Sequence, residues 1–515
     1  MTLIEHKMIE PLLEFVGFIP LLALSSALVW GSTIIYSLYI HPLSKIPGPK
    51  LWAISRIPFA RSFMAGTAVQ DIEKLHRKYG PIVRTQPNAV SFAHPDAWQD
   101  IQGARSSSGG KPYLKDPTWW KSMSSASQSI ATAIEHDTHA RIRKTLAPAF
   151  TLRALKQQEP LLQRGVALLI QRLQEKITKA DGTSDSFDII PWFNFTAFDV
   201  FGDIAFGETF DCLETSNYHP FVALICESIK SHSMVLGIRL FPELEYVFKK
   251  WVFPYMMNEK QKKYGTAVID RVNRRMQWDV SRPDVMSYVI AANEKGAMTP
   301  GEVQATFQTL TLAGSETTAT TLSGIMTQLL THPEAYEKLV GEIRGKLEKE
   351  GDITLDALKN LPYLNACLNE AMRLCTATPF TLPRIVPKGG DKVCGTWIAG
   401  GTSVFILPWA VNRDPNLWHD ATSFHPERWL PGAMEEKSPF SNDRRDTLHS
   451  FGEGPRKCIG MHLAWAEIRL ILTRILWSLD LELVEKTIEW EQQKVYVLIE
   501  RGPLIVKLKE RGDTQ

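Results

Sequence analysis

The chain has 515 residues, of which 44% are hydrophobic and 22% are charged. This composition excludes an intrinsically disordered protein, and the length suffices for one large enzyme with a sizeable core. Lysine and arginine number 58 against 56 aspartate and glutamate residues, so the net charge of +2 gives no reason to expect nucleic-acid binding. The six cysteines are scattered without CxxC pairs, which indicates free thiols in a reducing compartment.

The first predicted element is an apolar helix near the N-terminus. Residues 15–40 carry no charge, and a helix of that length spans about 39 Å, enough to cross a ~30 Å hydrocarbon core. A cleaved signal peptide would have a shorter apolar region, a basic start and a small-residue cleavage site. Glutamates precede the run, whereas Lys45, Lys50, Arg56 and Arg61 follow it. The positive-inside bias therefore predicts a single-pass membrane anchor, residues 1–40, with the C-terminal part of the chain in the cytosol.

A proline-rich hinge, residues 41–50, follows the predicted anchor. It reads HPLSKIPGPK, and its prolines lack backbone donors and fix φ, which favours a stiff turn over a helix. The sequence after it has no internal repeats and no further change of composition. We therefore expect residues 51–515 to form a single catalytic domain.

The longest predicted helix lies between Thr299 and Pro333. Thr299 and Glu302 have the spacing of a capping box with proline at the first helical position, and Pro333 closes the run. Between Glu302 and Glu334 the only formal charge is that of Glu316. The many threonine, serine and glutamine residues argue against a second membrane span. A helix that crosses the core is the better interpretation.

The segment AGSETT, residues 313–318, lies in the middle of this helix. Ala313 and Gly314 remove side-chain bulk, so that a flat partner can approach the backbone, although a mid-helix glycine costs up to about 1 kcal/mol relative to alanine. Glu316 and Thr317 place a carboxylate and a hydroxyl in an apolar setting, where a buried acid without a partner is costly and often functional. The alternative is that the hydroxyls of this segment only bond to carbonyls of the preceding turn.

Two further motifs follow this helix. Residues 363–375 have the apolar spacing of a helix, on which Glu370 and Arg373 are three residues apart and can meet. As an exposed pair they would contribute only about 0.2–0.5 kcal/mol. Arg384 then precedes a β-rich stretch, and the motif FHPERW, residues 424–429, contains Arg428.

The last motif is the loop FGEGPRKCIG, residues 451–460, which surrounds Cys458 with glycines and two cations. A buried structural cysteine needs no such neighbours. A metal-clip cysteine would bring a second cysteine two residues away, and this loop has none. Neither explanation accounts for the loop.

AGSETT, EAMR (residues 370–373), FHPERW and FGEGPRKCIG occur in the order typical of the cytochrome P-450 family of haem-thiolate monooxygenases, and the chain is identified as a member over essentially its whole length. The segments HPLSKIPGPKLW and EHDTHARIRKTLAPAF resemble fungal microsomal members of secondary metabolism, such as the isotrichodermin hydroxylase and pisatin demethylase groups. The resemblance implies a mainly α fold with small β-sheets, preceded by a single N-terminal transmembrane helix. It also implies haem b as cofactor and insertion of one oxygen atom of O₂ into an apolar small molecule.

The resemblance gives each motif residue a role. Cys458 would bind the haem iron as a thiolate, and Glu316 with Thr317 would relay protons to the oxygen that is being reduced. Glu370, Arg373 and Arg428 would form a structural salt-bridged triad under the haem. The residues implied to hold the cofactor are His139, Arg143, Ala313, Gly314, Arg384, Phe451, Arg456, Cys458 and Gly460. His139 departs from the tryptophan of many members, yet an imidazole can still donate a hydrogen bond to a haem propionate.

The resemblance also implies partners and a location. The chain has no flavin or nicotinamide motif, so electrons would come from NADPH-cytochrome P-450 reductase, with cytochrome b5 as a second candidate donor. A basic patch that includes Lys144, Arg444, Arg445 and Lys457 could dock an acidic partner. The protein would lie in the endoplasmic reticulum membrane with its catalytic domain in the cytosol.

Two alternatives stay open for the function. A haem-thiolate isomerase or dehydratase rearranges peroxides without O₂ or a reductase, but its relatives commonly lack the distal alcohol, so Thr317 argues against it. A non-catalytic membrane haem sensor would use the same cysteine loop but would not need Glu316 and Thr317. The sequence specifies neither the substrate nor the oxidised position.

Overall fold

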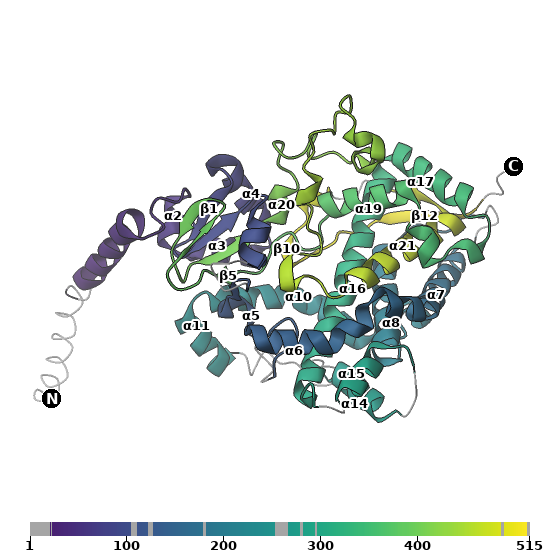
Figure 1. Cartoon of the computed structure of the whole chain (residues 1–515), viewed down its shortest axis with the longest axis horizontal. Coiled ribbons are helices and arrows are strands. Elements are labelled where there is room, and N and C mark those ends of the chain that lie inside the picture. Colours follow the sequence, from purple (N-terminus) through teal and green to yellow (C-terminus); the bar gives the residue numbers. More distant parts are fainter. Residues whose placement is uncertain are drawn as a thin grey trace, which may run out of the picture.

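The computed structural model describes residues 21, 23–104, 111–121, 127–178, 182–252, 266–278, 282–293, 296–485 and 489–511 (Figure 1). Most of these residues are helical, and the strands among them form four small sheets. This confirms the predicted mainly α fold with small β-sheets. An N-terminal helix stands apart from the remainder of the chain.

The helices are α2 (Lys50–Ile54), α3 (Ile57–Ala65), α4 (Ala68–Tyr79), α5 (Pro117–Trp120), α6 (His136–Leu146), α7 (Leu152–Gln174), α8 (Ile190–Phe206), α9 (Cys212–Thr215), α10 (Pro220–Arg239), α11 (Pro242–Val247), α14 (Ala267–Gln277), α15 (Val285–Asn293), α16 (Pro300–Thr331), α17 (Pro333–Lys346), α18 (Leu355–Leu358), α19 (Pro362–Leu374), α20 (Pro408–Val411) and α21 (Met461–Ser478). The strands are β1 (Ile82–Gln86), β2 (Ala89–Phe92), β3 (Leu114–Lys115), β4 (Phe187–Asp188), β5 (Arg384–Ile385), β6 (Asp391–Val393), β7 (Thr396–Ile398), β8 (Ser403–Ile406), β9 (Leu479–Leu483), β10 (Val495–Tyr496), β11 (Leu498–Ile499) and β12 (Ile505–Glu510).

Helix α16 runs through the middle of the domain and packs against α8, α14, α19 and α21 (Figure 1). Its start is the predicted capping box: the Glu302 amide donates to Thr299 Oγ1 at 3.2 Å, and the Thr299 amide donates to the Glu302 carboxylate at 2.9 Å. The helix ends at Thr331, and Pro333 opens α17. The prediction of a helix that crosses the core is confirmed, because most of its side chains are buried.

The largest sheet has the strand order β1-β2-β8-β5-β3 and brings distant segments together. Strands β2 and β8 are parallel, whereas the other neighbouring pairs are antiparallel. At the β3 end, Lys115 lies directly opposite Arg384 of β5. This pairing places two cationic side chains at one edge of the sheet.

The helix that precedes the domain has the length and apolar composition to cross a membrane over Ala23–Ile40, and only 6% of that stretch is buried. The predicted span began at residue 15, and residues 15–20 and 22 lie outside the described part of the chain. The end of the helix is docked on the domain, because the buried Ser37 donates to the Ala53 carbonyl at 2.5 Å and its own carbonyl accepts from Arg84 at 2.7 Å.

The proline-rich segment that follows forms turns before α2 begins at Lys50. An added Cβ at Gly48 would overlap the carbonyl oxygen of Arg84, so this position requires glycine. The close approach fixes the direction in which the chain enters the domain.

Candidate active site

The middle of α16 presents accessible side chains inside the domain. Leu312 is 36% exposed and Ala313 is also exposed, although the residues on both sides of them in the helix are mostly buried. We infer from these accessible side chains in the middle of a core helix that an internal space lies beside this turn of α16. Thr317 is partly exposed and lies four residues after Ala313, hence on the same helix face.

Gly314 has a different reason for its small size. An added Cβ would lie 2.7 Å from the ring of Phe201 on α8, so the glycine permits the close packing of α8 against α16. The expectation that Gly314 opens the helix to a flat cofactor therefore finds no support in its surroundings. Ala313 is the residue of this pair that faces the internal space.

The threonine hydroxyls of the AGSETT segment bond to the preceding turn, as the alternative interpretation predicted. Thr317 Oγ1 donates to the Ala313 carbonyl at 2.7 Å, and Thr318 Oγ1 donates to the Gly314 carbonyl at 2.8 Å. The Ser315 hydroxyl instead donates to the Ala197 carbonyl at 3.3 Å. The Thr317 oxygen keeps lone pairs with which it can accept a further hydrogen bond.

Glu316 is fully buried and has a charged partner that the sequence analysis did not find. Arg501 Nη2 donates to Glu316 Oε2 at 2.8 Å, and the same guanidinium bonds to Asn194 Oδ1 and Thr320 Oγ1. On the other oxygen, Cys226 Sγ donates to Oε1 at 3.3 Å. Arg501 stands 185 residues after Glu316 with no motif around it, so nothing in the local sequence indicated this ion pair.

The cysteine loop is folded tightly. The Cys458 amide donates to the Phe451 carbonyl at 2.8 Å, and Gly452 and Gly454 adopt positive φ angles of 73° and 74°. An added Cβ at Gly454 would overlap the carbonyl of Gln102, so both the conformation and the space require glycine. Gly460 is the N-cap of α21, which places the positive end of that helix beside the sulfur.

Cys458 is the exposed member of the six cysteines. Burial by the surrounding protein nevertheless raises the pKa of its thiol, while the Gly460 amide and the charge of Arg143 lower it. A sulfur that is accessible and yet desolvated borders an internal space. The other five thiols are buried or only partly exposed.

Several of the predicted cofactor-binding cations gather beside this loop. The Arg456 guanidinium donates to the Ala133 and Ile134 carbonyls, both at 2.6 Å, and Arg384 donates to the Tyr113 carbonyl at 3.0 Å. Arg143 donates to the Lys457 carbonyl at 2.8 Å. The unpredicted Lys115 is also present, and we call Lys115, His139, Arg384 and Arg456 the cationic cluster.

The cationic cluster has an excess of positive charge, which Lys115, Arg384 and Arg456 carry. Burial, and after it the charges of neighbouring cations, lower the pKa of His139 to about 3 and that of Arg384 to about 9. The same two causes lower the pKa of Lys115 well below its usual value. Burial lowers the pKa of Arg456 to about 10. Exposed Glu135 raises the pKa of Arg456, but no carboxylate of the described residues forms an ion pair with the cluster. Buried cations without counter-charges cost several kcal/mol, so the cluster calls for an anionic group.

Comparison with known proteins accounts for this arrangement. The family model described as cytochrome P-450 matches residues 46–508. The chain belongs to the cytochrome P-450 family. It is 39% identical to cytochrome P-450 monooxygenase lcsI of Purpureocillium lilacinum, over 92% of this chain and 91% of the relative. It is 37% identical to the averantin hydroxylase of Dothistroma septosporum, over 95% of this chain and 91% of the relative.

A third relative, cytochrome P-450 monooxygenase astJ of Aspergillus oryzae, is 37% identical over 95% of this chain and 96% of its own length. These relatives confirm the predicted fungal cytochrome P-450 resemblance and the prediction that the chain is a monooxygenase. Members of the family bind haem through a cysteine thiolate ligand to iron. The predicted cofactor class is therefore confirmed.

The residues present fit a cytochrome P-450 haem. Haem carries two propionates, and Lys115, Arg384 and Arg456 form no ion pair with a carboxylate of the described residues. The His139 imidazole, which is neutral near pH 7, can donate a hydrogen bond. The accessible and desolvated Cys458 sulfur suits a ligand to iron, and exposed Ala313 suits contact with a flat ring. Phe451 is partly buried and contacts the core.

The predicted triad is fully buried. Glu370 forms ion pairs with Arg373 at 2.7 Å and with Arg428 at 2.9 Å, and all three side chains have 0% exposure. Glu370 also accepts from the Trp429 indole at 2.9 Å and from the His425 amide at 3.0 Å. Burial opposes ionisation, but the hydrogen bonds and charges of the two arginines hold the pKa of Glu370 below its usual value. The prediction that Glu370 and Arg373 meet on one helix is confirmed, in a buried rather than an exposed pair.

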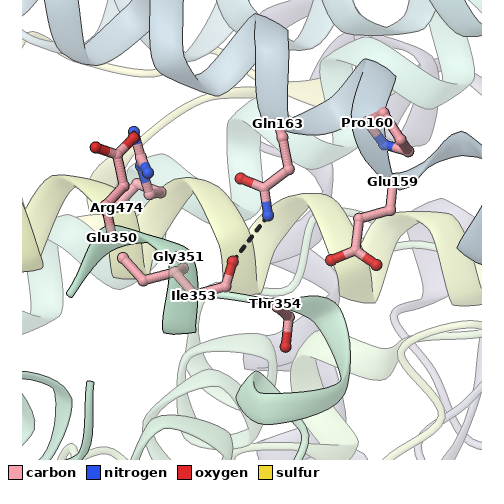
Figure 2. A pocket seen from close by; sticks show the side chains of 8 residues that line it. All are labelled: Glu159, Pro160, Gln163, Glu350, Gly351, Ile353, Thr354 and Arg474. Atoms are coloured by element: carbon pink, nitrogen blue, oxygen red, sulfur yellow. Dashed lines mark hydrogen bonds and ion pairs between the residues drawn. The ribbon is translucent and has the colours of Figure 1, made fainter. Parts of the chain in front are cut away.

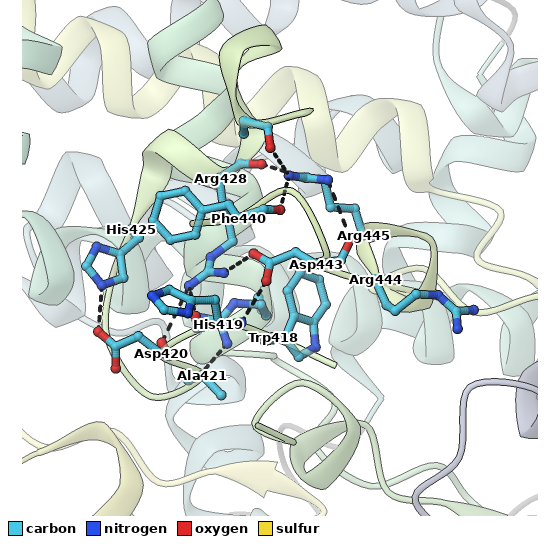
Figure 3. Close-up of polar contacts among 12 residues, drawn as sticks. Trp418, His419, Asp420, Ala421, His425, Arg428, Phe440, Asp443, Arg444 and Arg445 are labelled. Atoms are coloured by element: carbon cyan, nitrogen blue, oxygen red, sulfur yellow. Dashed lines mark hydrogen bonds and ion pairs between the residues drawn. The ribbon is translucent and has the colours of Figure 1, made fainter. Parts of the chain in front are cut away.

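A fourth charged residue, which the sequence analysis missed, completes the network. Asp443 forms a buried ion pair with Arg428 and accepts from the His419 amide at 2.7 Å (Figure 3). Arg445, expected in the docking patch, donates instead to the Arg428, Ala433 and Phe440 carbonyls. Arg445 therefore holds this segment together, while its side chain stays partly exposed and its place in the basic patch stays a prediction.

Two surface hollows lie outside the internal space. A groove of about 550 Å³ lies between α7 and the segment 350–354 beside α21 and contains none of the predicted site residues. Its lining comprises Glu159, Pro160, Gln163, Glu350, Gly351, Ile353, Thr354 and Arg474 (Figure 2). A second hollow of about 360 Å³ adjoins the start of α21, just after the cysteine loop, and is lined by Leu152, Leu155, Leu355, Lys359, Met461, His462, Trp465, Ala466 and Arg469.

Proposed function

We propose that this cytochrome P-450 hydroxylates an apolar small molecule by inserting one atom of O₂, with Cys458 as the iron ligand and Glu316 and Thr317 in proton transfer. The observation that carries the proposal is the partly exposed Thr317, on the same face of α16 as exposed Ala313. Hydroxylation is the reaction type that we choose because one relative is named a hydroxylase.

Bound haem would supply the activation of O₂, and the chain's own residues would control protons and water around it. Thr317 Oγ1 donates to the Ala313 carbonyl, which orients the hydroxyl oxygen so that it can accept from a water in the internal space. Arg501 fixes Glu316 through Oε2. Oε1 is therefore the oxygen left to exchange a proton on this route, and it accepts from the Cys226 thiol, its partner among the described residues.

The variant Thr317→Val tests the proposed reaction. Valine keeps the β-branched shape and removes the hydroxyl, so haem, substrate binding and electron entry are expected to stay intact. We expect NADPH and O₂ consumption to continue while the ratio of product to NADPH falls by about tenfold or more, because proton transfer by a positioned group contributes about 10²–10⁴-fold. The measurement is the yield of product and of hydrogen peroxide per NADPH.

Thr311→Val is the matched control for that experiment. Thr311 makes the same kind of bond to the preceding turn, to the Phe307 carbonyl at 2.8 Å, but its side chain is fully buried. The control is expected to keep the wild-type ratio of product to NADPH. An unchanged ratio in Thr317→Val would remove Thr317 from the mechanism. Product formation by the wild-type protein without consumption of O₂ or NADPH would instead favour an isomerase or dehydratase.

We propose NADPH-cytochrome P-450 reductase as the electron donor, with cytochrome b5 as a second donor. Two observations support this proposal. The hollow of about 360 Å³ beside the cysteine loop has Lys359 and Arg469 in its lining. Lys144 and Lys457 are also exposed. Arg444 contributes less than expected, because its guanidinium bonds to both carboxylate oxygens of Asp446. Cations around an apolar hollow suit an acidic protein partner.

We propose that the protein is a single-pass protein of the endoplasmic reticulum membrane, with residues 1–40 as anchor, 41–50 as hinge and 51–515 as cytosolic catalytic domain. A second apolar surface supports contact between domain and membrane: Leu244, Tyr246 and Val247 of α11 and the adjacent Trp251 are each at least 50% exposed. Arg56 ties the start of α3 to this region by donating to the Leu240 carbonyl at 2.6 Å.

Truncation tests the anchor. Because Ser37 is docked on Arg84, deletion of residues 1–34 removes most of the apolar span and leaves that contact in place. We expect the truncated protein to keep haem and to be released from microsomes by an alkaline carbonate wash, even if the α11 surface retains it in ordinary buffer. Retention through the carbonate wash would contradict a single anchor. Deletion of residues 1–40 is expected to be less stable, because it leaves buried Arg84 without the Ser37 acceptors.

A further inference from the structure

Helix α10 is tied to two parts of the domain that border the haem site. In its first half, the Cys226 thiol donates to the Glu316 carboxylate of α16 at 3.3 Å. At its end, Arg239 donates to the Lys121 carbonyl at 2.7 Å, in the segment that also carries Lys115 of the cationic cluster. Helix α10 therefore extends over the internal space from the acid of α16 to the cationic cluster.

His232 lies between these two contacts and has no polar partner. Its side chain is exposed, yet burial by the surrounding protein, and after it the charge of Arg239, lower the pKa of its imidazole. Like the Cys458 sulfur, this side chain is accessible and desolvated at once, which indicates an internal space rather than bulk solvent. Within the described part of the chain it forms neither a hydrogen bond nor an ion pair.

The face of α10 that carries His232 points into the domain and has no net charge. Leu236 and Arg239 follow His232 by about one and two helical turns, hence on the same face, and are only 3% and 5% exposed. The Glu245 carboxylate lies 3.4 Å from Arg239 Nε and balances the charge of the guanidinium. His232 therefore offers one donor and one acceptor of a neutral imidazole to the internal space.

We propose that His232 is a substrate-binding residue that forms a hydrogen bond with a hydroxyl or carbonyl oxygen of an otherwise apolar substrate. The proposal rests on the proposed function, because it takes the space between α10 and α16 as the substrate site. A pure hydrocarbon would leave the imidazole nitrogens desolvated and unpaired, which is unfavourable. A carboxylate would meet no free counter-charge on this face, so a neutral oxygen group suits it better.

Three probes with one carbon skeleton test the proposal: fluorene, fluorenol and fluorene carboxylate. Equilibrium dialysis against the full-length holoprotein gives the Kd of each probe. The variant His232→Phe keeps a ring of similar size and removes both nitrogens. We expect it to raise the Kd of fluorenol about tenfold, through the loss of one hydrogen bond, and to leave the Kd of fluorene unchanged. We also expect the wild-type protein to bind the carboxylate more weakly than fluorenol.

His232→Gln is the rescue variant, because a glutamine amide keeps a donor and an acceptor at this position. It is expected to restore most of the affinity for fluorenol. Both variants are expected to keep the thiolate-type spectrum with CO, which shows that the haem site is intact.

Ser231→Ala is the matched control, because Ser231 is an exposed polar residue that is turned about 100° away from His232 on the helix. It should leave all three constants unchanged. Equal rises for fluorene and fluorenol in His232→Phe would overturn the proposal in favour of a residue that only shapes the space. An unchanged Kd of fluorenol, or no measurable binding of fluorenol to the wild-type protein, would overturn it as well. Dialysis needs neither NADPH nor O₂, so a wild-type protein that binds fluorenol without oxidising any substrate would contradict the proposed function rather than the role of His232.

Discussion

Replacement of Cys458 by serine is expected to abolish the thiolate-type red-shifted Soret band of the reduced CO complex and with it all monooxygenase activity. A serine hydroxyl keeps its proton near neutral pH and does not supply the electron density that a thiolate gives to the iron. The Gly460 amide and Arg143 are placed to favour the anion of a sulfur at this position. The measurement is the difference spectrum of the reduced protein with and without CO.

Cys394→Ser is the matched control for this loss. Cys394 is partly exposed and lies in the hairpin between β6 and β7, outside the cysteine loop. Its replacement is expected to leave the spectrum unchanged. A thiolate-type band that persists in Cys458→Ser would mean that another of the cysteines holds the iron.

The second large effect is expected from Glu370→Gln, which should prevent accumulation of stable holoprotein. The carboxylate of Glu370 accepts from Arg373, Arg428, the Trp429 indole and the His425 amide, all in the buried interior. Glutamine removes the charge and turns one acceptor into a donor. Breaking a buried ion pair costs about 3–5 kcal/mol, a large part of the ~5–15 kcal/mol that stabilises a folded protein. Thermal unfolding of the purified holoprotein measures this loss.

Glu427→Gln is the comparison variant, from the same short segment as Arg428. Glu427 pairs with Lys338 at 3.0 Å, but its side chain is 40% exposed. An exposed pair contributes at most about 1 kcal/mol, so this variant should unfold at nearly the wild-type temperature. Equal losses in the two variants would mean that burial of the Glu370 network adds nothing to stability.

The Glu370 network also predicts a loss of stability in acid. The pKa of Glu370 is lower in the folded chain than its usual 4.5, so the folded state favours the carboxylate. The resulting stabilisation is present above pH 4.5 and is lost as the pH falls through the lower pKa of the folded protein. Because the network holds the segment that leads to the cysteine loop, we expect haem loss in acid to accompany this change.

Features that depend on near neighbours in the chain could be predicted from the sequence. The capping box at Thr299, the end of α16 before Pro333 and the meeting of Glu370 with Arg373 all involve residues that are next to each other or three apart. Local hydrogen bonding and helical spacing fix such contacts wherever the helix lies in the fold. The glycines around Cys458 likewise indicated a tight turn, since positive φ favours that residue.

The partners of the charged groups were decided by the tertiary structure. Arg501 reaches Glu316 across 185 residues, and Asp443 completes the triad from a segment without a motif. Lys115 lies beside Arg384 because strand pairing joins two segments that are far apart in the sequence. Such pairs depend on how whole elements pack, and a single charged residue in a sequence does not indicate which distant charge will meet it. The sequence by itself therefore determined the family, the iron ligand that we propose and the positions of the main helices in the chain. The packing of these elements decided which buried charges find a partner within the chain.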